Sequence, residues 1–151
     1  MNFRDDGATA PPALTAEQLT QRLRAEFPEA FNTDSGLAIE SVWHGGCRVR
    51  LTFRQTSLRP GGTISGPTMM ALADVAMYVA LLASIGWVPL AVTTQLNINF
   101  LRKPNVGDLI GEARLLKLGK RLAVGEVSLR SDGEDAIVAH ATSTYSIPDQ
   151  R

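Results

Sequence analysis

The spacing of hydrophobic positions predicts two helices of different character. Leu19 and Leu23 recur at helical intervals after Thr15, which begins a capping-box pattern. The segment 67–85 is apolar on nearly every side, and Gly86 follows it. Because a helix that is apolar all round must be covered, this second helix should lie inside the protein rather than on its surface.

Most of the other hydrophobic positions alternate with polar ones, which is typical of β-strands. Two such segments flank Gly45-Gly46 and predict a hairpin, because a glycine pair tolerates the tight turn between antiparallel strands. Four more follow the apolar helix, at residues 90–101, 108–118, 121–131 and 136–147. Their short connections predict antiparallel neighbours. The order of elements predicts an α+β fold in which one antiparallel sheet surrounds one long helix, with an added N-terminal helix.

Length and composition agree with one folded unit. The chain has 151 residues, so we expect a loose tail over 1–14 and a single domain over 15–151. Its 15 basic and 15 acidic residues give no net charge, which argues against nucleic acid as a partner. The single Cys47 cannot form an internal disulfide, and the two histidines, His44 and His140, show no zinc-binding spacing, so no metal is expected.

The N-terminal sequence and the apolar helix also bear on location. Residues 1–13 carry two acids and no apolar core, unlike a secretory signal, so we expect a cytoplasmic protein. The run 67–90 is long enough to cross a bilayer, but a charged Asp74 near its middle would cost about 2.5–3.5 kcal/mol there. We therefore expect a buried core helix and no membrane partner.

Asp74 is the only charged residue in that apolar run. It follows a glycine-rich segment, 61–66, that can turn sharply and expose backbone N–H groups. An unpartnered buried carboxylate is so unfavourable that it neutralises or acquires hydrogen-bond donors, and perturbed acids are frequent at functional sites. The alternative is an aspartate that faces solvent from one side of a core helix, and spacing alone leaves both interpretations open.

Two motifs resemble one known family. They are Gly62-x-x-Ser65-Gly66-Pro67-x-x-x-x-Leu72-Ala73-Asp74 and, after the long helix, Asn97-Ile98-Asn99-Phe100-Leu101-Arg102-Lys103-Pro104. Over residues 36–147 the chain is similar to the hotdog-fold acyl-CoA thioesterases of the phenylacetic-acid (PaaI-like) type. The resemblance implies a hotdog fold, an acyl-CoA substrate, and active sites at the interface of two subunits that pair into a continuous sheet. It also implies a homodimer or a dimer of dimers, and no cofactor beyond the coenzyme A of the substrate.

The match to the family motif is partial. The agreeing positions are Gly62, Gly66, Leu72 and Asp74. Arg59 stands where the family has Asn, Ser65 where it has His, and Pro67 where it has a second Gly. The tripeptide His44-Gly45-Gly46 lies far upstream of Asp74 and is assigned to the predicted hairpin turn instead.

By this resemblance Asp74 is the catalytic carboxylate, acting as a general base toward water or as a nucleophile. The Gly66 backbone N–H would stabilise the oxyanion, because N–H groups at a helix start are unpaired and lie at the positive end of the helix dipole. A hydroxyl from the partner subunit, assigned to Thr93, would assist the acid, although β-propensity alone also explains a threonine there. Ser65 is expected to cap the helix, with substrate orientation as its alternative role.

Further residues are candidates for substrate binding. The segment 102–121 contains six basic residues and only two acidic ones. This surplus of positive charge suits the phosphates of coenzyme A, although basic side chains also protect strand edges. Methionine and tyrosine residues on the long helix suit an acyl pocket or core packing. The candidates are Arg59, Gly62, Ser65, Met70, Met77, Tyr78, Asn97, Arg102, Lys103, Lys120 and Arg121.

Together these residues predict an acyl-CoA thioesterase for small or medium acyl groups. The alternative is a non-catalytic acyl-CoA-binding protein of the same fold, in which the changes at Arg59 and Ser65 have abolished turnover. Retention of Asp74 favours the enzyme, since a binding protein gains little from a buried acid. A hotdog hydratase would need an Asp–His pair, and neither histidine is placed for one.

Overall fold

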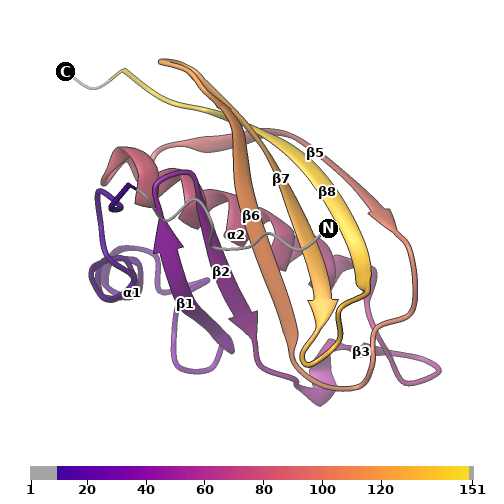
Figure 1. Ribbon diagram of the computed structural model, residues 1–151. Helices are drawn as coiled ribbons and strands as arrows, with labels where there is room; N and C mark the ends of the chain where they lie inside the picture. Colours follow the sequence, from indigo (N-terminus) through magenta and orange to yellow (C-terminus); the bar gives the residue numbers. More distant parts are fainter. Residues whose placement is uncertain (1–9, 150–151) are drawn as a thin grey trace.

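In the computed structural model, which describes residues 10–149, a curved sheet of six strands lies against one long helix (Figure 1). The elements are α1 (Ala16–Glu26), β1 (Leu37–Trp43), β2 (Gly46–Leu51), a 3₁₀ turn (Gln55–Ser57), β3 (Leu58–Arg59), β4 (Thr63–Ile64), α2 (Gly66–Ile85), β5 (Val92–Phe100), β6 (Leu109–Leu118), β7 (Leu122–Ser131) and β8 (Ile137–Ser146). The large sheet has the order β1-β2-β6-β7-β8-β5, and each neighbouring pair is antiparallel. The predicted α+β architecture is confirmed.

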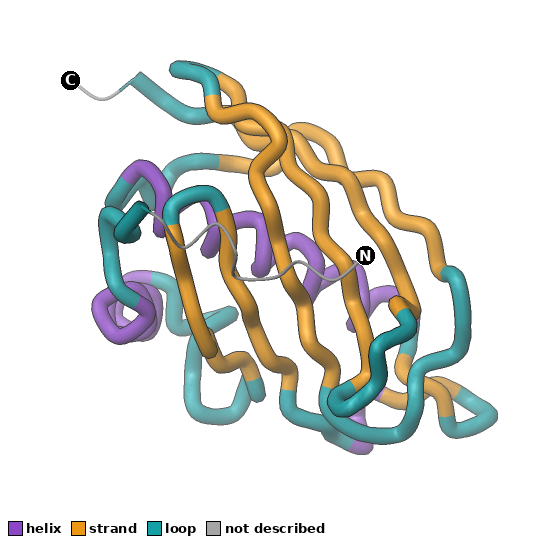
Figure 2. The backbone as a smooth tube through the Cα atoms, viewed as in Figure 1, coloured by secondary structure: helices purple, strands orange, loops and turns teal. Residues whose placement is uncertain are grey.

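The central helix α2 is part of the core along most of its length. The Ser65 hydroxyl caps it by accepting a hydrogen bond from the Thr68 N–H, and Gly86 ends it with a φ of 95°. Its buried residues run from Met69 to Ser84, and the sheet wraps around this side of the helix (Figure 2). The helix is long and apolar enough to cross a bilayer, but 67% of its 18-residue apolar window is buried inside the domain. Its apolar surface is therefore covered by protein, as predicted.

The N-terminal helix α1 is firmly docked on the domain. The Thr15 hydroxyl accepts a hydrogen bond from the Gln18 N–H, and the Gln18 side chain accepts one from the Thr15 N–H, which confirms the capping box. Leu19 and Leu23 are fully buried where α1 packs against β1 and α2. The helix ends at Glu26, beside the segment that follows α2.

The chain forms two tight hairpins before α2. The β1–β2 turn consists of His44 and Gly45, and Gly46 is already the first residue of β2. Gly45 has a positive φ of 97°, whereas Gly46 lies so close to the Trp43 ring that a side chain would not fit. A second hairpin, β3–β4, occupies the glycine-rich segment before α2. The sequence did not predict it because its strands have only two residues each.

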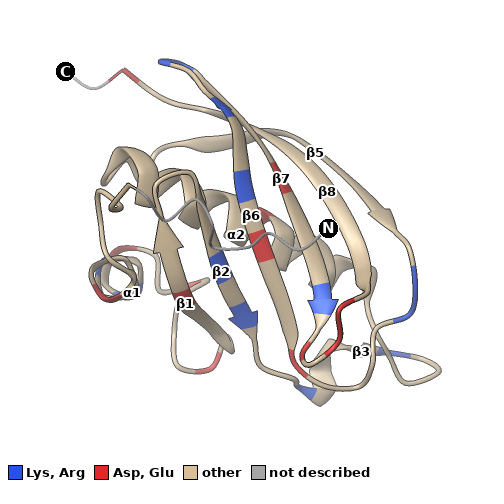
Figure 3. Ribbon diagram, viewed as in Figure 1, with Lys and Arg blue, Asp and Glu red and all other residues tan. Residues whose placement is uncertain are grey.

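Charged residues occur along β2, β6 and β7 (Figure 3), and they alternate with buried residues such as Val49 and Val127, which places them on the outer face of the sheet, opposite α2. Cross-strand contacts pair Glu112 with Arg130 (2.7 Å) and Arg114 with Glu126 (2.6 Å). Burial alone would raise the pKa of Glu126, but hydrogen bonds from His140 and Arg114 lower it below its ordinary value. Arg114, one of the six basic residues counted toward a phosphate site, is therefore engaged in the sheet.

Replacing Leu23 with alanine is expected to lower the free energy of unfolding by about 2–5 kcal/mol, because the fully buried side chain would leave a cavity under α1. Chemical denaturation measures the change. The control is Gln21→Ala, which lies on the exposed side of the same helix. Equal stability of the two variants would show that docking of α1 does not contribute to the core.

Candidate active site

Asp74 lies in α2 with its carboxylate held by two hydroxyl groups. Its Oδ1 accepts hydrogen bonds from Thr93 Oγ1 (2.6 Å) and from the Tyr145 hydroxyl (2.9 Å). The Tyr145 hydroxyl also lies 3.1 Å from the Asp74 carbonyl oxygen. The second carboxylate oxygen, Oδ2, accepts no hydrogen bond from the described residues, so it is the atom that remains for water or a substrate.

Strand pairing explains why these two hydroxyls meet the acid. Thr93 on β5 and Tyr145 on β8 are direct cross-strand partners on the face toward α2. The pairing register shifts between Thr93 and Gln95, a bulge of the kind that re-aims side chains near functional sites. Burial raises the pKa of Tyr145 well above the ordinary value of a phenol, so Tyr145 stays protonated as a donor to Asp74.

The contact between Thr93 and Asp74 forms within one chain. The family resemblance implied that this hydroxyl comes from a partner subunit, and the geometry differs from that expectation. The neighbouring Thr94 instead donates to the carbonyl oxygen of Thr144 (3.2 Å). Tyr145 was not among the predicted site residues. Alternation along the last strand was the available signal, since it places this aromatic hydroxyl on the inner face, where it requires a polar partner.

A cavity of about 460 Å³ opens beside Asp74. Apolar side chains such as Val75 and Leu90 form much of its wall, and a few polar atoms converge at Asp74, as is usual for small-molecule sites. Tyr78, a predicted substrate-binding residue, lies in this wall. Its hydroxyl donates to the Pro89 carbonyl oxygen (2.9 Å), which fixes the loop after α2 against the helix.

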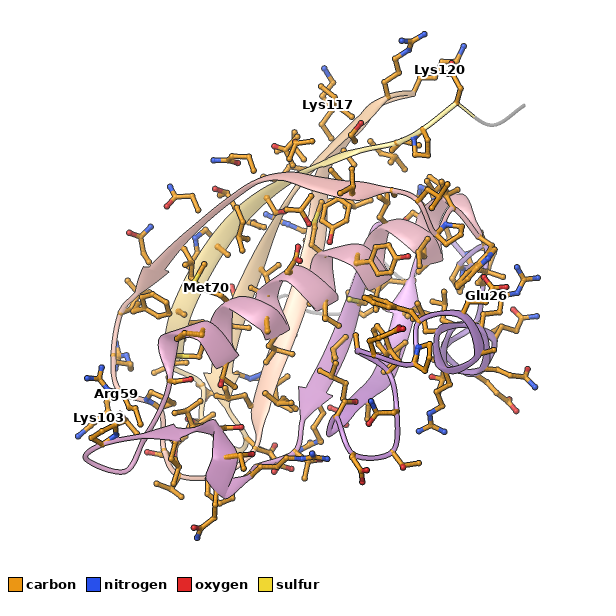
Figure 4. All side chains as sticks on the ribbon, turned by 180° about the vertical axis from the view of Figure 1, so that it is seen from behind. Glu26, Arg59, Met70, Lys103, Lys117 and Lys120 are labelled. Atoms are coloured by element: carbon orange, nitrogen blue, oxygen red, sulfur yellow. The ribbon has the colours of Figure 1, made fainter. Side chains whose placement is uncertain are left out.

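The end of α1 and the loop after α2 form another part of the cavity wall. Trp87 Nε1 donates to Glu26 Oε2 (3.0 Å), and the Arg22 guanidinium lies 5.4 Å from the centre of the Trp87 ring. Figure 4 places Glu26 near the C-terminal end of α2, whereas Met70 lies toward its N-terminal end. The N-terminal helix, whose role the sequence left open, therefore helps to enclose the cavity.

Gly66 is the first residue of α2, and within residues 10–149 its N–H makes no hydrogen bond. It precedes Asp74 by eight residues, or about 12 Å along the helix axis. One thioester carbonyl cannot contact both groups of a single chain. The ring of Phe100, at the far end of β5, lies close to Gly66, since a Cβ at this glycine would be 3.4 Å from the ring.

The two predicted methionines lie in different surroundings, and neither lines the cavity. Met77 is fully buried, and its Sδ lies so close to Gly125 that a Cβ there would clash. Met77 is therefore a core residue that does not line this cavity. Met70 is 39% exposed toward the N-terminal end of α2.

The predicted basic residues do not form one cluster. Figure 4 shows Arg59 and Lys103 close together near the start of α2, whereas Lys120 lies at the opposite end of the molecule. Arg102 and Arg121 adjoin Lys103 and Lys120 in the sequence, so the predicted set divides into two groups. The phosphates of one coenzyme A can meet one of these groups, not both.

Two other predicted residues lie away from the acid. Leu96 and Ile98 pack against the core, so Asn97 between them lies on the outer face of the sheet, opposite Asp74. Gly62 has a φ of 76° in the turn between β3 and β4. The structure gives Asn97 no place in the cavity of its own chain, and Gly62 serves the local turn.

Other reactive side chains lie outside this site. Cys47 is fully buried with its Sγ 2.9 Å from the Ala76 carbonyl oxygen, and burial raises the pKa of its thiol, so it is not a nucleophile. His44 is in the hairpin turn, and His140 contacts Glu126 on the outer face. Within the described part of the chain, no group of three or more His, Cys, Asp or Glu side chains is arranged to hold a metal ion.

Comparisons with known proteins identify the family of this chain. The thioesterase superfamily matches residues 61–138, a range that contains Gly66, Asp74 and Thr93. A protein of Saccharolobus solfataricus that is provisionally named an esterase is 30% identical over 136 residues, covering 90% of this chain and 87% of that protein.

Solved structures extend the likeness to the fold. The crystal structure of a provisionally assigned thioesterase from Silicibacter sp. TM1040 has a TM-score of 0.82 and 45% identity, covering 91% of this chain and 94% of that one. Zebrafish thioesterase superfamily member 2 has a TM-score of 0.78 and 23% identity, covering 90% and 100%, and this likeness concerns the fold alone. The chain therefore belongs to the thioesterase superfamily and has the hotdog fold.

Proposed function

We propose that this protein is an acyl-CoA thioesterase of the phenylacetic-acid (PaaI-like) type that hydrolyses small or medium acyl groups. The observation that carries the proposal is the Asp74 carboxylate in the wall of a largely apolar cavity. One oxygen is held by Thr93 and Tyr145, and the other accepts no hydrogen bond from residues 10–149. An acyl group would fill the apolar cavity, and its thioester carbonyl would then lie next to the Asp74 carboxylate.

Hydrolysis of a thioester needs an acceptor for the proton of water and a donor for the developing oxyanion. As a general base, Asp74 Oδ2 takes a proton from water, whose oxygen attacks the carbonyl carbon. The tetrahedral intermediate then expels the coenzyme A thiolate, which takes up a proton. As a nucleophile, Oδ2 attacks the carbonyl carbon itself, the carbon–sulfur bond breaks and the coenzyme A thiolate leaves, and the resulting anhydride is later hydrolysed by water. In both routes Thr93 and Tyr145 hold the carboxylate in one orientation.

The free edge of the sheet supports pairing with a second copy of the chain. β5 is an edge strand of nine residues that contains no proline and no lysine. Its ends are exposed and apolar, with Val92 57% and Phe100 49% accessible. Long edges of this kind pair with another strand unless they are protected. We therefore propose a homodimer, or a dimer of dimers, with a continuous sheet through two β5 strands.

Such a dimer would complete the active site. An antiparallel pairing about a two-fold axis at the middle of β5 sets Val92 of one copy, the neighbour of Thr93, opposite Phe100 of the other. Thr93 holds Asp74, and Phe100 lies against Gly66. The pairing therefore brings Asp74 of one copy beside Gly66 of the second copy, whose N–H becomes the oxyanion donor.

Coenzyme A would extend from the reacting carbonyl toward the basic residues near that glycine. Arg59 and Lys103 lie at the same end of α2 as Gly66. Arginine and lysine side chains at this position suit the phosphates of the substrate. We assign the phosphates to this group rather than to Lys120 and Arg121 at the opposite end.

Replacing Tyr145 with phenylalanine is expected to lower kcat by about 5- to 30-fold. The change removes one of two hydrogen bonds to Asp74, so the productive orientation of the carboxylate loses about 1–2 kcal/mol of stabilisation. The control is Tyr78→Phe, which removes a hydroxyl that lines the same cavity but donates to the Pro89 carbonyl oxygen and not to Asp74. We expect the control to stay close to the native rate. Equal losses in both variants would contradict the positioning role of Tyr145.

The experiment that tests the function is a thiol-release assay over a panel of aliphatic and aromatic acyl-CoAs. Release that depends on Asp74 supports the thioesterase. Absence of release, together with acyl-CoA-dependent stabilisation against heat, would support the acyl-CoA-binding alternative. Neither release nor stabilisation would contradict both.

A further inference from the structure

The cavity beside Asp74 is lined by two carboxylates and by no positively charged side chain among the described residues. Asp74 lies in α2, and Glu26 lies where α1 ends, next to the loop that follows α2. Ile85, the last residue of α2, follows Asp74 by eleven residues, or about 16 Å of helix. The wall of the cavity therefore extends from the catalytic acid toward a second acid at the C-terminal end of α2.

The position of Glu26 is fixed by several contacts. Its Oε2 accepts a hydrogen bond from Trp87 Nε1, and the Trp87 ring is in turn covered by the Arg22 guanidinium. α1 itself is anchored by Leu19 and Leu23, which are fully buried. The other carboxylate oxygen of Glu26, Oε1, accepts no hydrogen bond from the described residues. A substrate group that reaches this end of the cavity therefore contacts the Glu26 carboxylate, whose position is fixed.

The size of the cavity indicates which acyl groups reach that charge. A cavity of about 150 Å³ is enough to bind benzene. The present one, at about 460 Å³, has room for a ring with a substituent or for a chain of medium length. A short acyl group would stay near Asp74, whereas a medium one would extend toward Glu26.

We propose that Glu26 selects the acyl group by charge, a role that rests on the proposed thioesterase function. Uncharged medium-length or single-ring acyl groups enter the cavity, and a terminal ammonium is tolerated beside Glu26. Glu26 is exposed to solvent. An acyl group that ends in a second carboxylate is disfavoured, because two like charges at contact distance repel each other even where water screens part of the repulsion. The expected discrimination is up to about tenfold.

The test compares three acyl-CoAs of equal length at six, eight and ten carbons. One ends in methyl, one in a carboxylate and one in an ammonium group. For the native protein we expect kcat/KM to be lowest for the carboxylate series, with the largest difference at the length that reaches Glu26. Glu26→Gln keeps an oxygen for Trp87 Nε1 while removing the charge, so it should raise kcat/KM for the carboxylate probe and lower it for the ammonium probe, each by up to about tenfold.

The control is Glu17→Gln, which removes the same charge from the first turn of α1, away from the cavity. It should leave all three probes unchanged. A merely structural effect of Glu26→Gln would shift the two charged probes in the same direction, and that result would overturn the proposal. So would a native protein that hydrolyses the carboxylate and methyl probes equally well.

Binding to the Asp74→Asn variant separates this proposal from the thioesterase function. Calorimetry with the same three probes measures selection by the cavity without turnover. Weaker binding of the carboxylate probe, restored to the level of the methyl probe by Glu26→Gln, supports selection by the charge of Glu26. This holds even if no acyl-CoA is hydrolysed. A different outcome is hydrolysis that depends on Asp74 while neither the rate nor the binding differs among the three probes. That result overturns selection by Glu26 and leaves the thioesterase function intact.

Discussion

Replacing Asp74 with asparagine is expected to lower kcat toward any good acyl-CoA substrate by about 10²- to 10⁴-fold. Asparagine has nearly the same shape, and its Oδ1 can still accept the hydrogen bonds from Thr93 and Tyr145. The amide nitrogen that replaces Oδ2 can neither take a proton from water nor attack a carbonyl carbon. The measurement is thiol release under saturating substrate, with a melting curve to confirm that the fold is retained.

The matched control for this change is Asp34→Asn, an exposed aspartate in the loop before β1. It alters the net charge of the protein by the same amount and should leave kcat unchanged. If the Asp74→Asn variant is folded and retains the native rate, Asp74 is neither base nor nucleophile, and the proposed chemistry is wrong.

Replacing Gly66 with proline is expected to lower kcat by about 10²- to 10³-fold, because it deletes the single N–H group assigned to the oxyanion. The first turn of a helix accepts proline, since the N–H there has no partner within the helix. Ser65, the preceding residue, already has the extended backbone that proline requires of its neighbour, with φ −70° and ψ 151°. The fold should therefore tolerate the change.

Gly66→Ala is the control for the proline variant. It keeps the N–H, and its Cβ would lie 3.4 Å from the Phe100 ring, an ordinary van der Waals contact. We expect a small change in kcat with alanine and a large one with proline. Similar losses in both variants would indicate that the site is sensitive to volume at this position rather than to the donor.

Local signals in the sequence were sufficient to predict the helices and strands and to single out Asp74 as a candidate site residue. The capping box at Thr15, the all-round apolar pattern of α2 and the alternation in the strands each depend on neighbouring residues, and the structure confirms the elements they predicted. Asp74 was visible because it is the only charge in an apolar run. Asp74 is partly buried, and Thr93 and Tyr145 supply the hydrogen bonds that a carboxylate needs when it is withdrawn from water.

Contacts between distant residues could not be predicted in this way. Trp87 and Glu26 are 61 residues apart, and no periodic pattern links the end of α1 to the loop after α2. The basic residues between 102 and 121 are close in sequence, but β6 carries the chain across the length of the sheet between Lys103 and Lys120, which separates them. Strand direction and register, not composition, decide which of them share a surface.

The most direct test of the central claim is to mix the Asp74→Asn and Gly66→Pro variants. If each active site combines Asp74 of one copy with Gly66 of the second copy, each mixed dimer contains one intact site. Random exchange of equal amounts then restores about one quarter of the native activity from two nearly inactive proteins. Subunit exchange is verified with differently tagged copies. Mixed dimers that form but stay as inactive as their parents would contradict a site shared between two chains.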